Sequence, residues 1–138
     1  MRIEFFCPME KIPTVTAQEK GVDFKNKRFY TKPEVQKVKN QYIAMLMMHR
    51  PRRMLEGAIA LNVSFRFPIT RGKKEGQWKI TKPDTDNMLK LLKDCGTACG
   101  YWQDDAQIAY EVVSKKYSEN SGIVFVAEEM EADNDKVN

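Results

Sequence analysis

The hydrophobic pattern of the chain is clearest over residues 58–68, where apolar and other residues alternate. The apolar positions are Ile59, Leu61, Val63, Phe65 and Phe67. Successive side chains of a β-strand point to opposite faces, so this alternation predicts a strand with one buried face. Shorter patterns predict a strand over residues 1–7 and a hairpin of two strands over residues 107–117 and 122–128.

Another segment has the spacing of an amphipathic helix. Apolar residues recur every three or four positions from Val35 to Leu46, which predicts a helix that ends near His49. Thr31 and Glu34 have the spacing of a capping box, so we expect this helix to begin beside them.

A second helix is expected farther along the chain, beginning at Asp84 or Thr85. It should end at Ala98 or Cys99, because Gly100 fits the position that follows a helix C-terminus. With the strands, the two helices predict an α+β fold, a two-layer sandwich in which two main helices pack on one face of a mixed β-sheet.

The remaining segments define the expected domain organisation. At 138 residues, with 42% apolar and 30% charged residues, the chain is typical of one globular domain. We expect this domain to span residues 1–128 and the acidic residues 129–138 to form a flexible tail. Residues 18–28 are polar and contain Gly21, which predicts a mobile loop. No apolar run approaches the roughly 18 residues of a membrane span, and three cysteines without a disulfide pattern favour a reducing cytoplasm.

Charge is distributed unevenly, although the net charge is only +4. Residues 20–53 contain ten Lys or Arg and two acids, a net charge of +8, and residues 66–82 contain six and one, a net charge of +5. Residues 84–111 reverse the sign, with six acids and two lysines. Basic segments on either side of an acidic centre suit a polyanion that approaches a metal site. The candidate contacts to the phosphates of such a polyanion, or to DNA if the polyanion is a nucleic acid, are Lys20, Lys25, Lys27, Arg28, Arg71, Lys73, Lys74 and Lys82.

The candidate chemistry lies in the acidic centre. Asp84 and Asp86 are two residues apart at the expected helix start, and Lys90 lies four residues beyond Asp86, on the same side of the helix. Asp104 and Asp105 follow the turn after the helix. Carboxylates brought together repel unless a cation joins them, and Mg²⁺ prefers such oxygen ligands. Two simpler interpretations stay open, in which Asp84 only caps the helix and Asp104–Asp105 only form a turn.

Residues 82–108 resemble the RusA family of Holliday-junction resolvases. The resemblance rests on Lys82-Pro83-Asp84-Thr85-Asp86-Asn87 with Lys90, and on the later Tyr101-Trp102-Gln103-Asp104-Asp105-Ala106-Gln107-Ile108. It implies that Asp84, Asp86 and Asp105 are the essential metal-binding aspartates, that Lys90 is catalytic, and that Asp104 is a neighbouring acid and a possible further ligand. It also implies Mg²⁺ or Mn²⁺ as the cofactor, a homodimer, and paired nicks across four-way DNA. The sequence departs from this pattern at Cys95-Gly96, where larger aliphatic residues are expected and the helix end should be looser.

Several alternatives remain at the level of the sequence. Cys95 and Cys99, with Cys7 and His49, could form a zinc site, but packing of both helical cysteines in the core is favoured. We expect the side chains of Tyr101 and Trp102 to be buried beside the helix rather than to stack on a base. A less selective nuclease for flaps or forks, and a protein that binds branched DNA without cutting it, are the alternative functions.

Overall fold

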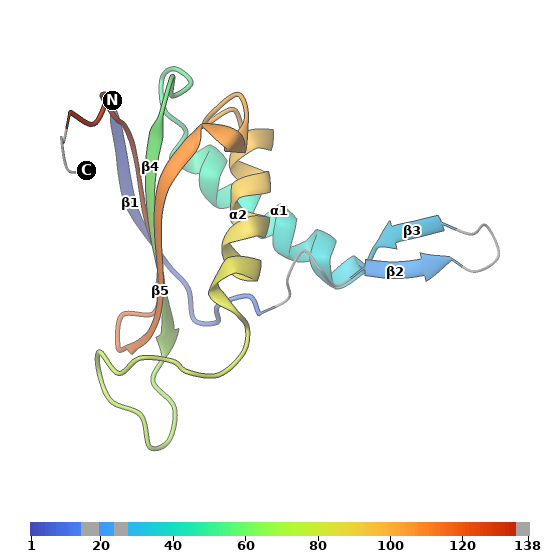
Figure 1. Ribbon diagram of the computed structural model, residues 1–138. Helices are drawn as coiled ribbons and strands as arrows, with labels where there is room; N and C mark the ends of the chain where they lie inside the picture. Colours follow the sequence, from blue (N-terminus) through green and yellow to red (C-terminus); the bar gives the residue numbers. More distant parts are fainter. Residues whose placement is uncertain (15–19, 24–27, 135–138) are drawn as a thin grey trace.

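The computed structural model describes residues 1–14, 20–23 and 28–134, and its elements form two layers (Figure 1). In chain order they are β1 (Arg2–Pro8), β2 (Lys20–Asp23), β3 (Arg28–Thr31), α1 (Pro33–Met48), β4 (Ile59–Pro68), α2 (Thr85–Ala98), the short 3₁₀ helix η1 (Asp105–Gln107), β5 (Ile108–Ser118) and β6 (Gly122–Glu129). The α+β class is confirmed. Within the described residues, no helix has both the length and the apolar character needed to cross a membrane.

The main sheet has the strand order β1-β6-β4-β5. Strand β4 pairs with β5 in parallel and with β6 in antiparallel orientation, so the sheet is mixed, as expected. The predicted hairpin of the last two strands is wrong, because β4 lies between them. Neighbouring strands are about 4.8 Å apart, so the three residues 119–121, which can span about 10 Å, are long enough to pass the end of β4.

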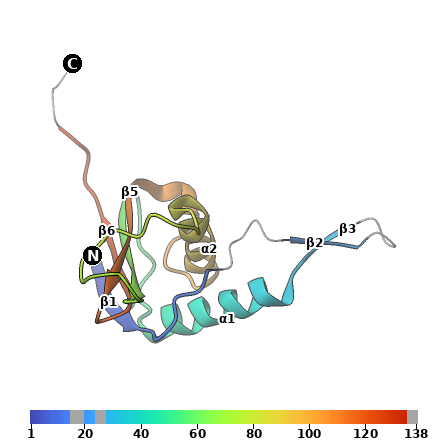
Figure 2. The ribbon, with the colours of Figure 1, turned by 90° about the horizontal axis from the view of Figure 1, so that it is seen from below.

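Both helices cover the same face of this sheet, as Figures 1 and 2 show. The alternating apolar residues of β4 point to this face and are buried, which confirms the predicted strand. The core between sheet and helices contains several large, fully buried side chains, namely Tyr42, Phe65, Tyr101, Trp102 and Phe125. No helix of the described residues lies on the opposite face of the sheet (Figure 2).

The helix termini show which local sequence signals determine where each helix begins and ends. Helix α1 begins at Pro33 with Lys32 at the N-cap, and the cap makes no side-chain hydrogen bond. The N-cap is therefore Lys32, one residue beyond the Thr31 that the capping box predicted, whereas the proline expected in the first turn is the first residue of the helix. Proline suits this position because its φ is already helical and it lacks an N–H. Helix α2 has the expected bounds, and Gly100 follows it with a φ of 78°.

The segment expected to be a mobile loop contains a second sheet. Strands β2 and β3 form an antiparallel hairpin in which Gly21 is paired with Tyr30. This hairpin projects from the N-terminal end of α1, away from the main sheet (Figures 1 and 2). The prediction missed it because each strand has only four residues, too few for a clear alternation of apolar and polar positions.

Gly96 is required by the packing of α2. A Cβ atom at this position would lie 2.4 Å from Cζ2 of Trp102, so only glycine allows the indole to pack against the helix. The indole N–H also donates a hydrogen bond to Oγ1 of Thr97 at 2.8 Å. The expectation of a loose helix end is wrong, because the missing side chain is replaced by a buried tryptophan.

The cysteines of α2 pack as apolar side chains. Cys95 and Cys99 are buried, and their thiols lie against the carbonyl oxygens of Lys39 and Ile43 on α1. Burial raises the pKa of Cys95 to about 11, which keeps this thiol protonated at neutral pH. The favoured interpretation, core packing, is confirmed for both residues.

Candidate active site

A solvent-open pocket of about 380 Å³ lies where α2, η1 and β5 meet on the helix-bearing side of the molecule. It brings together three of the expected site residues, Asp86, Lys90 and Asp105. The other lining residues are Thr85, Asn87, Leu89, Lys93, Glu111 and Val113. Residues from three elements that are distant in sequence therefore form one polar cavity.

Helix geometry and strand pairing together bring the charged groups to the pocket. Asp86 and Lys90 are four residues apart on α2, so their side chains project from the same side of the helix. The opposite side of α2 holds buried leucines, including Leu91 and Leu92, which fix the rotation of the helix against the core. The parallel pairing of β5 with β4 then places Glu111 opposite Leu61, on the helix-bearing face.

Asp84 occupies the N-cap position of α2, but its side chain makes no capping hydrogen bond. The interpretation of Asp84 as a simple cap is therefore not supported. The chain just before it is held by Lys115 of β5, whose ammonium group donates hydrogen bonds to the carbonyl oxygens of Thr81 at 2.7 Å and Pro83 at 2.6 Å. The Asp84 side chain is exposed and is not among those that line the pocket.

The neighbouring acids Asp104 and Asp105 have different surroundings. Asp104 caps η1: its Oδ1 accepts a hydrogen bond from the N–H of Ala106 at 2.8 Å. Asp105 is the first residue of η1, is half-buried and lines the pocket. Asp104 thus has a structural role in this arrangement, and Asp105 is the acid that faces the pocket.

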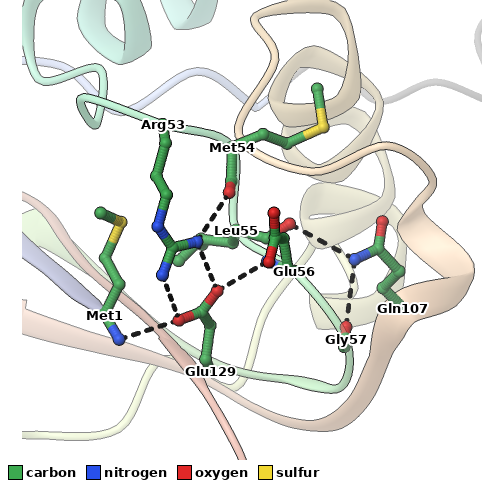
Figure 3. A network of polar contacts seen from close by, with 8 residues as sticks. All are labelled: Met1, Arg53, Met54, Leu55, Glu56, Gly57, Gln107 and Glu129. Atoms are coloured by element: carbon green, nitrogen blue, oxygen red, sulfur yellow. Dashed lines mark hydrogen bonds and ion pairs between the residues drawn. The ribbon is translucent and has the colours of Figure 1, made fainter.

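Gln107 completes the capping box and connects η1 to the loop before β4. Its Oε1 accepts hydrogen bonds from the N–H groups of Gln103 at 2.9 Å and Asp104 at 3.0 Å. Its Nε2 donates to the carbonyl oxygens of Gly57 at 3.0 Å and Leu55 at 3.4 Å. Figure 3 shows this side chain directed at the loop, so one amide anchors the turn that carries Asp105.

The same loop is fixed on its other side by Glu129 (Figure 3). The Glu129 carboxylate accepts two hydrogen bonds from the Arg53 guanidinium, at 2.8 and 2.9 Å, and one from the Glu56 N–H at 2.7 Å. The Met1 amino group lies 2.9 Å from the same carboxylate. Arg53 above all, and then these other donors, hold the pKa of Glu129 far below its ordinary value.

Charge compensation in the pocket is incomplete among the described residues. Lys93 forms an ion pair with Glu111 at 3.1 Å. Lys90, Asp86 and Asp105 form no ion pair with any described residue, so the described part of the chain leaves the charge of all three groups without an ion-pair partner.

The donor types suit a hard divalent cation, because carboxylate and amide oxygens surround one cavity. In the part of the chain that the structure describes, no three Asp, Glu, His or Cys side chains are close enough together to hold one ion. The chemistry of the donors therefore fits a hard divalent cation, and the spacing of the described acidic side chains does not form a complete coordination shell.

The predicted phosphate contacts divide into three groups. Arg71, Lys74 and Lys82 are exposed in the connection between β4 and α2, and Lys73 lies over the Tyr117 ring at 5.6 Å from its centroid. Lys20 and Arg28 belong to the projecting β2–β3 hairpin. Lys25 and Lys27 lie outside the described residues.

Three residues near the site could not have been identified from the sequence. Glu111, Lys93 and Lys115 belong to no motif, and they reach the site only because β5 lies next to β4 and beside α2. The buried pair Tyr101 and Trp102, by contrast, was expected, and both side chains are in the core.

Carboxylates and a lysine that form no ion pair with a described residue, in a pocket open to solvent, are typical of metal-dependent enzymes that act on phosphodiesters. Comparison with known proteins gives the family. The family model described as Endodeoxyribonuclease RusA matches residues 8–127. The chain therefore belongs to the RusA family of endodeoxyribonucleases.

Two relatives extend this match. The protein named crossover junction endodeoxyribonuclease rusA from Lactococcus phage r1t is 35% identical over 129 residues, which cover 89% of this chain and 95% of the phage protein. The uncharacterized protein YqaN from Bacillus subtilis (strain 168) is 30% identical over 132 residues, which cover 87% of this chain and 92% of that protein. The resemblance drawn from residues 82–108 thus extends over nearly the whole chain.

Proposed function

We propose that this endonuclease resolves four-way DNA junctions by paired symmetric nicks, with Mg²⁺ as its cofactor and Mn²⁺ as a substitute. The observation that carries the proposal is the shared pocket of Asp86, Lys90 and Asp105 in a member of the RusA family. The phage relative, which matches this chain over most of its length, is named a crossover junction endodeoxyribonuclease.

Asp84, Asp86 and Asp105 would hold the metal ion. When bound, Mg²⁺ activates a water molecule and stabilises charge on the scissile phosphate. Asp86 and Asp105 line the same pocket from different elements, and Asp84 is the N-cap residue of the helix that carries Asp86. Lys90 would bind the nonbridging oxygen of that phosphate, which is charge stabilisation of the kind that typically contributes about 3 kcal/mol.

DNA would contact basic side chains near this pocket and on the β2–β3 hairpin. Lys82 immediately precedes α2, and Arg71 and Lys74 are exposed in the preceding connection. Such contacts to phosphates give affinity without a sequence code, and affinity falls steeply with salt. A homodimer in the bacterial cytoplasm suits this substrate, since a four-way junction has two-fold symmetry and two identical sites can cut it symmetrically.

The direct test compares cleavage of an immobile four-way junction with cleavage of a linear duplex, with Mg²⁺ and with EDTA. Asp86→Asn should abolish cleavage and keep junction binding. Asp94→Asn is the matched control, because Asp94 is an exposed acid on the same helix that does not line the pocket. Equal cutting of flaps or forks would indicate the less selective nuclease, and binding without any product would indicate a non-cleaving binder.

A further inference from the structure

The connection between β4 and α2 carries two large apolar side chains that are open to solvent. Ile80 is 90% exposed and Trp78 is 63% exposed. Ile80 is more exposed than any other large apolar side chain of the described residues. The connection projects from one end of the main sheet (Figure 1). Two such side chains close together in a polar segment indicate an interaction surface.

The backbone that carries these side chains is fixed to β5. Trp78 forms an antiparallel bridge with Lys116. The N–H of Lys79 donates a hydrogen bond to the carbonyl oxygen of Lys115 at 3.0 Å, and the ammonium group of Lys115 donates to the carbonyl oxygen of Thr81 at 2.7 Å. The chain is therefore anchored on both sides of the exposed isoleucine.

Side chains alternate in direction along this segment. The Lys79 ammonium group lies over the Phe67 ring, 4.9 Å from its centroid, and donates a hydrogen bond to the Thr81 hydroxyl at 2.6 Å. Lys79 and Thr81 thus lie against the molecule. Residues two apart in an extended chain point to the same side, so Trp78 and Ile80 point together to the other side. These two residues, here called the apolar pair, form one exposed feature on a fixed backbone.

The surroundings of the apolar pair are basic. Residues 66–82 contain six Lys or Arg and one acid, Glu75, whose carboxylate is held at the end of β5 by two hydrogen bonds. Exposed basic side chains lie on both sides of the pair in the sequence, with Arg71 and Lys74 before it and Lys82 after it. A surface of this kind suits a polyanion.

DNA combines a row of phosphates with apolar base faces, which are accessible only where stacking is interrupted. In a linear duplex an apolar wedge must first separate two stacked base pairs, and a branch point reduces this cost because stacking is already interrupted there. We propose that the apolar pair packs on the base pairs at the branch point of a DNA junction and thereby selects branched DNA over linear duplex. The inference deepens the proposed function and rests on it for the identity of the substrate.

The position of the apolar pair relates the branch point to the site of cleavage. Ile80 precedes Asp84 by four residues, so their Cα atoms are at most about 14 Å apart. Neighbouring nucleotides of one strand are about 3.4 Å apart, so this distance corresponds to about four nucleotides. With the metal ion at Asp84 and Asp86, the cut should fall within about four nucleotides of the branch point.

Binding of the full chain to an immobile four-way junction and to a linear duplex of the same length, both in EDTA, tests the selection. Trp78→Ala and Ile80→Ala should each lower the affinity for the junction about tenfold, the size typical of one base-stacking contact. The affinity for the duplex should stay nearly unchanged. Trp78→Phe should keep most of the affinity for the junction, because an aromatic ring remains.

Two controls separate this contact from general effects. Met48 is an apolar residue of α1 that is 80% exposed, and Met48→Ala should change neither affinity. Lys74→Ala should lower the affinities for junction and duplex by the same factor, as expected for a phosphate contact.

Tryptophan fluorescence reports on the contact directly. The chain contains two tryptophans, and Trp102 is buried in the core. Stacking on a base quenches indole emission, so the junction should quench the emission of Trp78, and the linear duplex should quench it much less. Trp78→Phe leaves only Trp102 and should show no quenching by the junction.

The proposal is wrong if Trp78→Ala and Ile80→Ala weaken binding to junction and duplex by the same factor, or if the duplex quenches Trp78 as strongly as the junction does. It is also wrong if either variant changes the sedimentation mass of the free protein, because the apolar pair would then belong to a contact between protein chains. Failure of the proposed function gives a different result. Selective binding and quenching by the junction without cleavage in Mg²⁺ or Mn²⁺ would overturn the nuclease activity and support the contact of the apolar pair with the branch point.

Discussion

Gln107 provides the sharpest test of how the structure holds Asp105. Its amide accepts two hydrogen bonds from N–H groups of the turn and donates to two carbonyl oxygens of the loop before β4. A hydrogen bond contributes about 1 kcal/mol on balance, and water replaces part of it at an exposed site. We expect Gln107→Ala to lower the free energy of unfolding by about 1–2 kcal/mol. For a domain of this size that corresponds to a fall in Tm of about 3–7 °C.

The effect on activity should be larger than the effect on stability. A displacement of about 1 Å at a reacting group can reduce the rate about 100-fold, and Gln107→Ala releases the turn that directs Asp105 into the pocket. We expect the rate of junction cleavage in Mg²⁺ to fall 10- to 100-fold, while junction binding in EDTA stays unchanged. Single-turnover cleavage and a binding titration measure the two quantities separately.

Two further variants isolate the contact. Gln107→Glu keeps an acceptor for the turn but replaces the donor that faces the carbonyls of Leu55 and Gly57, so it should lose as much activity as Gln107→Ala. Gln103→Ala is the control, because the Gln103 side chain is exposed and forms no hydrogen bond with a described residue. Wild-type cleavage by Gln107→Ala would refute the positioning of Asp105 by this amide.

The remaining predictions concern catalysis, packing and pH. Lys90→Ala should reduce cleavage about 100-fold or more with a small change in junction affinity, because the ammonium acts on charge that develops during the reaction; a near wild-type single-turnover rate would contradict that role. Gly96→Ala should lower the free energy of unfolding by about 2 kcal/mol or more, because the new Cβ overlaps the Trp102 ring. Denaturant titration measures this change. The control is Ala98→Gly, at an exposed position near the helix end, which should lower the free energy of unfolding by less. The folded-state pKa of Glu129 is depressed chiefly by Arg53, so its contribution to stability is complete above the unfolded pKa of about 4.3 and declines as the pH falls below it. Urea titrations between pH 3 and 7 should therefore show that the free energy of unfolding falls more steeply with decreasing pH for the wild type than for Glu129→Gln. Equal slopes for the two proteins would show that the Glu129 carboxylate does not contribute to the pH dependence of stability.

The sequence by itself determined the elements that depend on local pattern. The alternation around Val63 marks β4, and the apolar spacing and Gly100 mark α2 with its bounds. Three residues of the candidate site were also found from the sequence, since Asp86 and Lys90 are one helical turn apart on α2 and Asp105 lies in the second motif of the resemblance. These features depend on neighbouring residues, whose geometry a helix or a strand fixes directly.

Only the tertiary structure decided which strands pair and what surrounds each acid. Alternation shows which face of a strand is buried but not which strand lies at its edge, so β5 and β6 were expected to be partners although both pair with β4. The pairing of β5 with β4 also brings Glu111 into the pocket. Asp104 and Asp105 are adjacent and chemically identical, and they differ only because Gln107 and a backbone N–H of η1 fix the turn so that one caps it and the other faces the pocket. Pairing of strands and long-range hydrogen bonds depend on the whole packed core, which no local pattern contains.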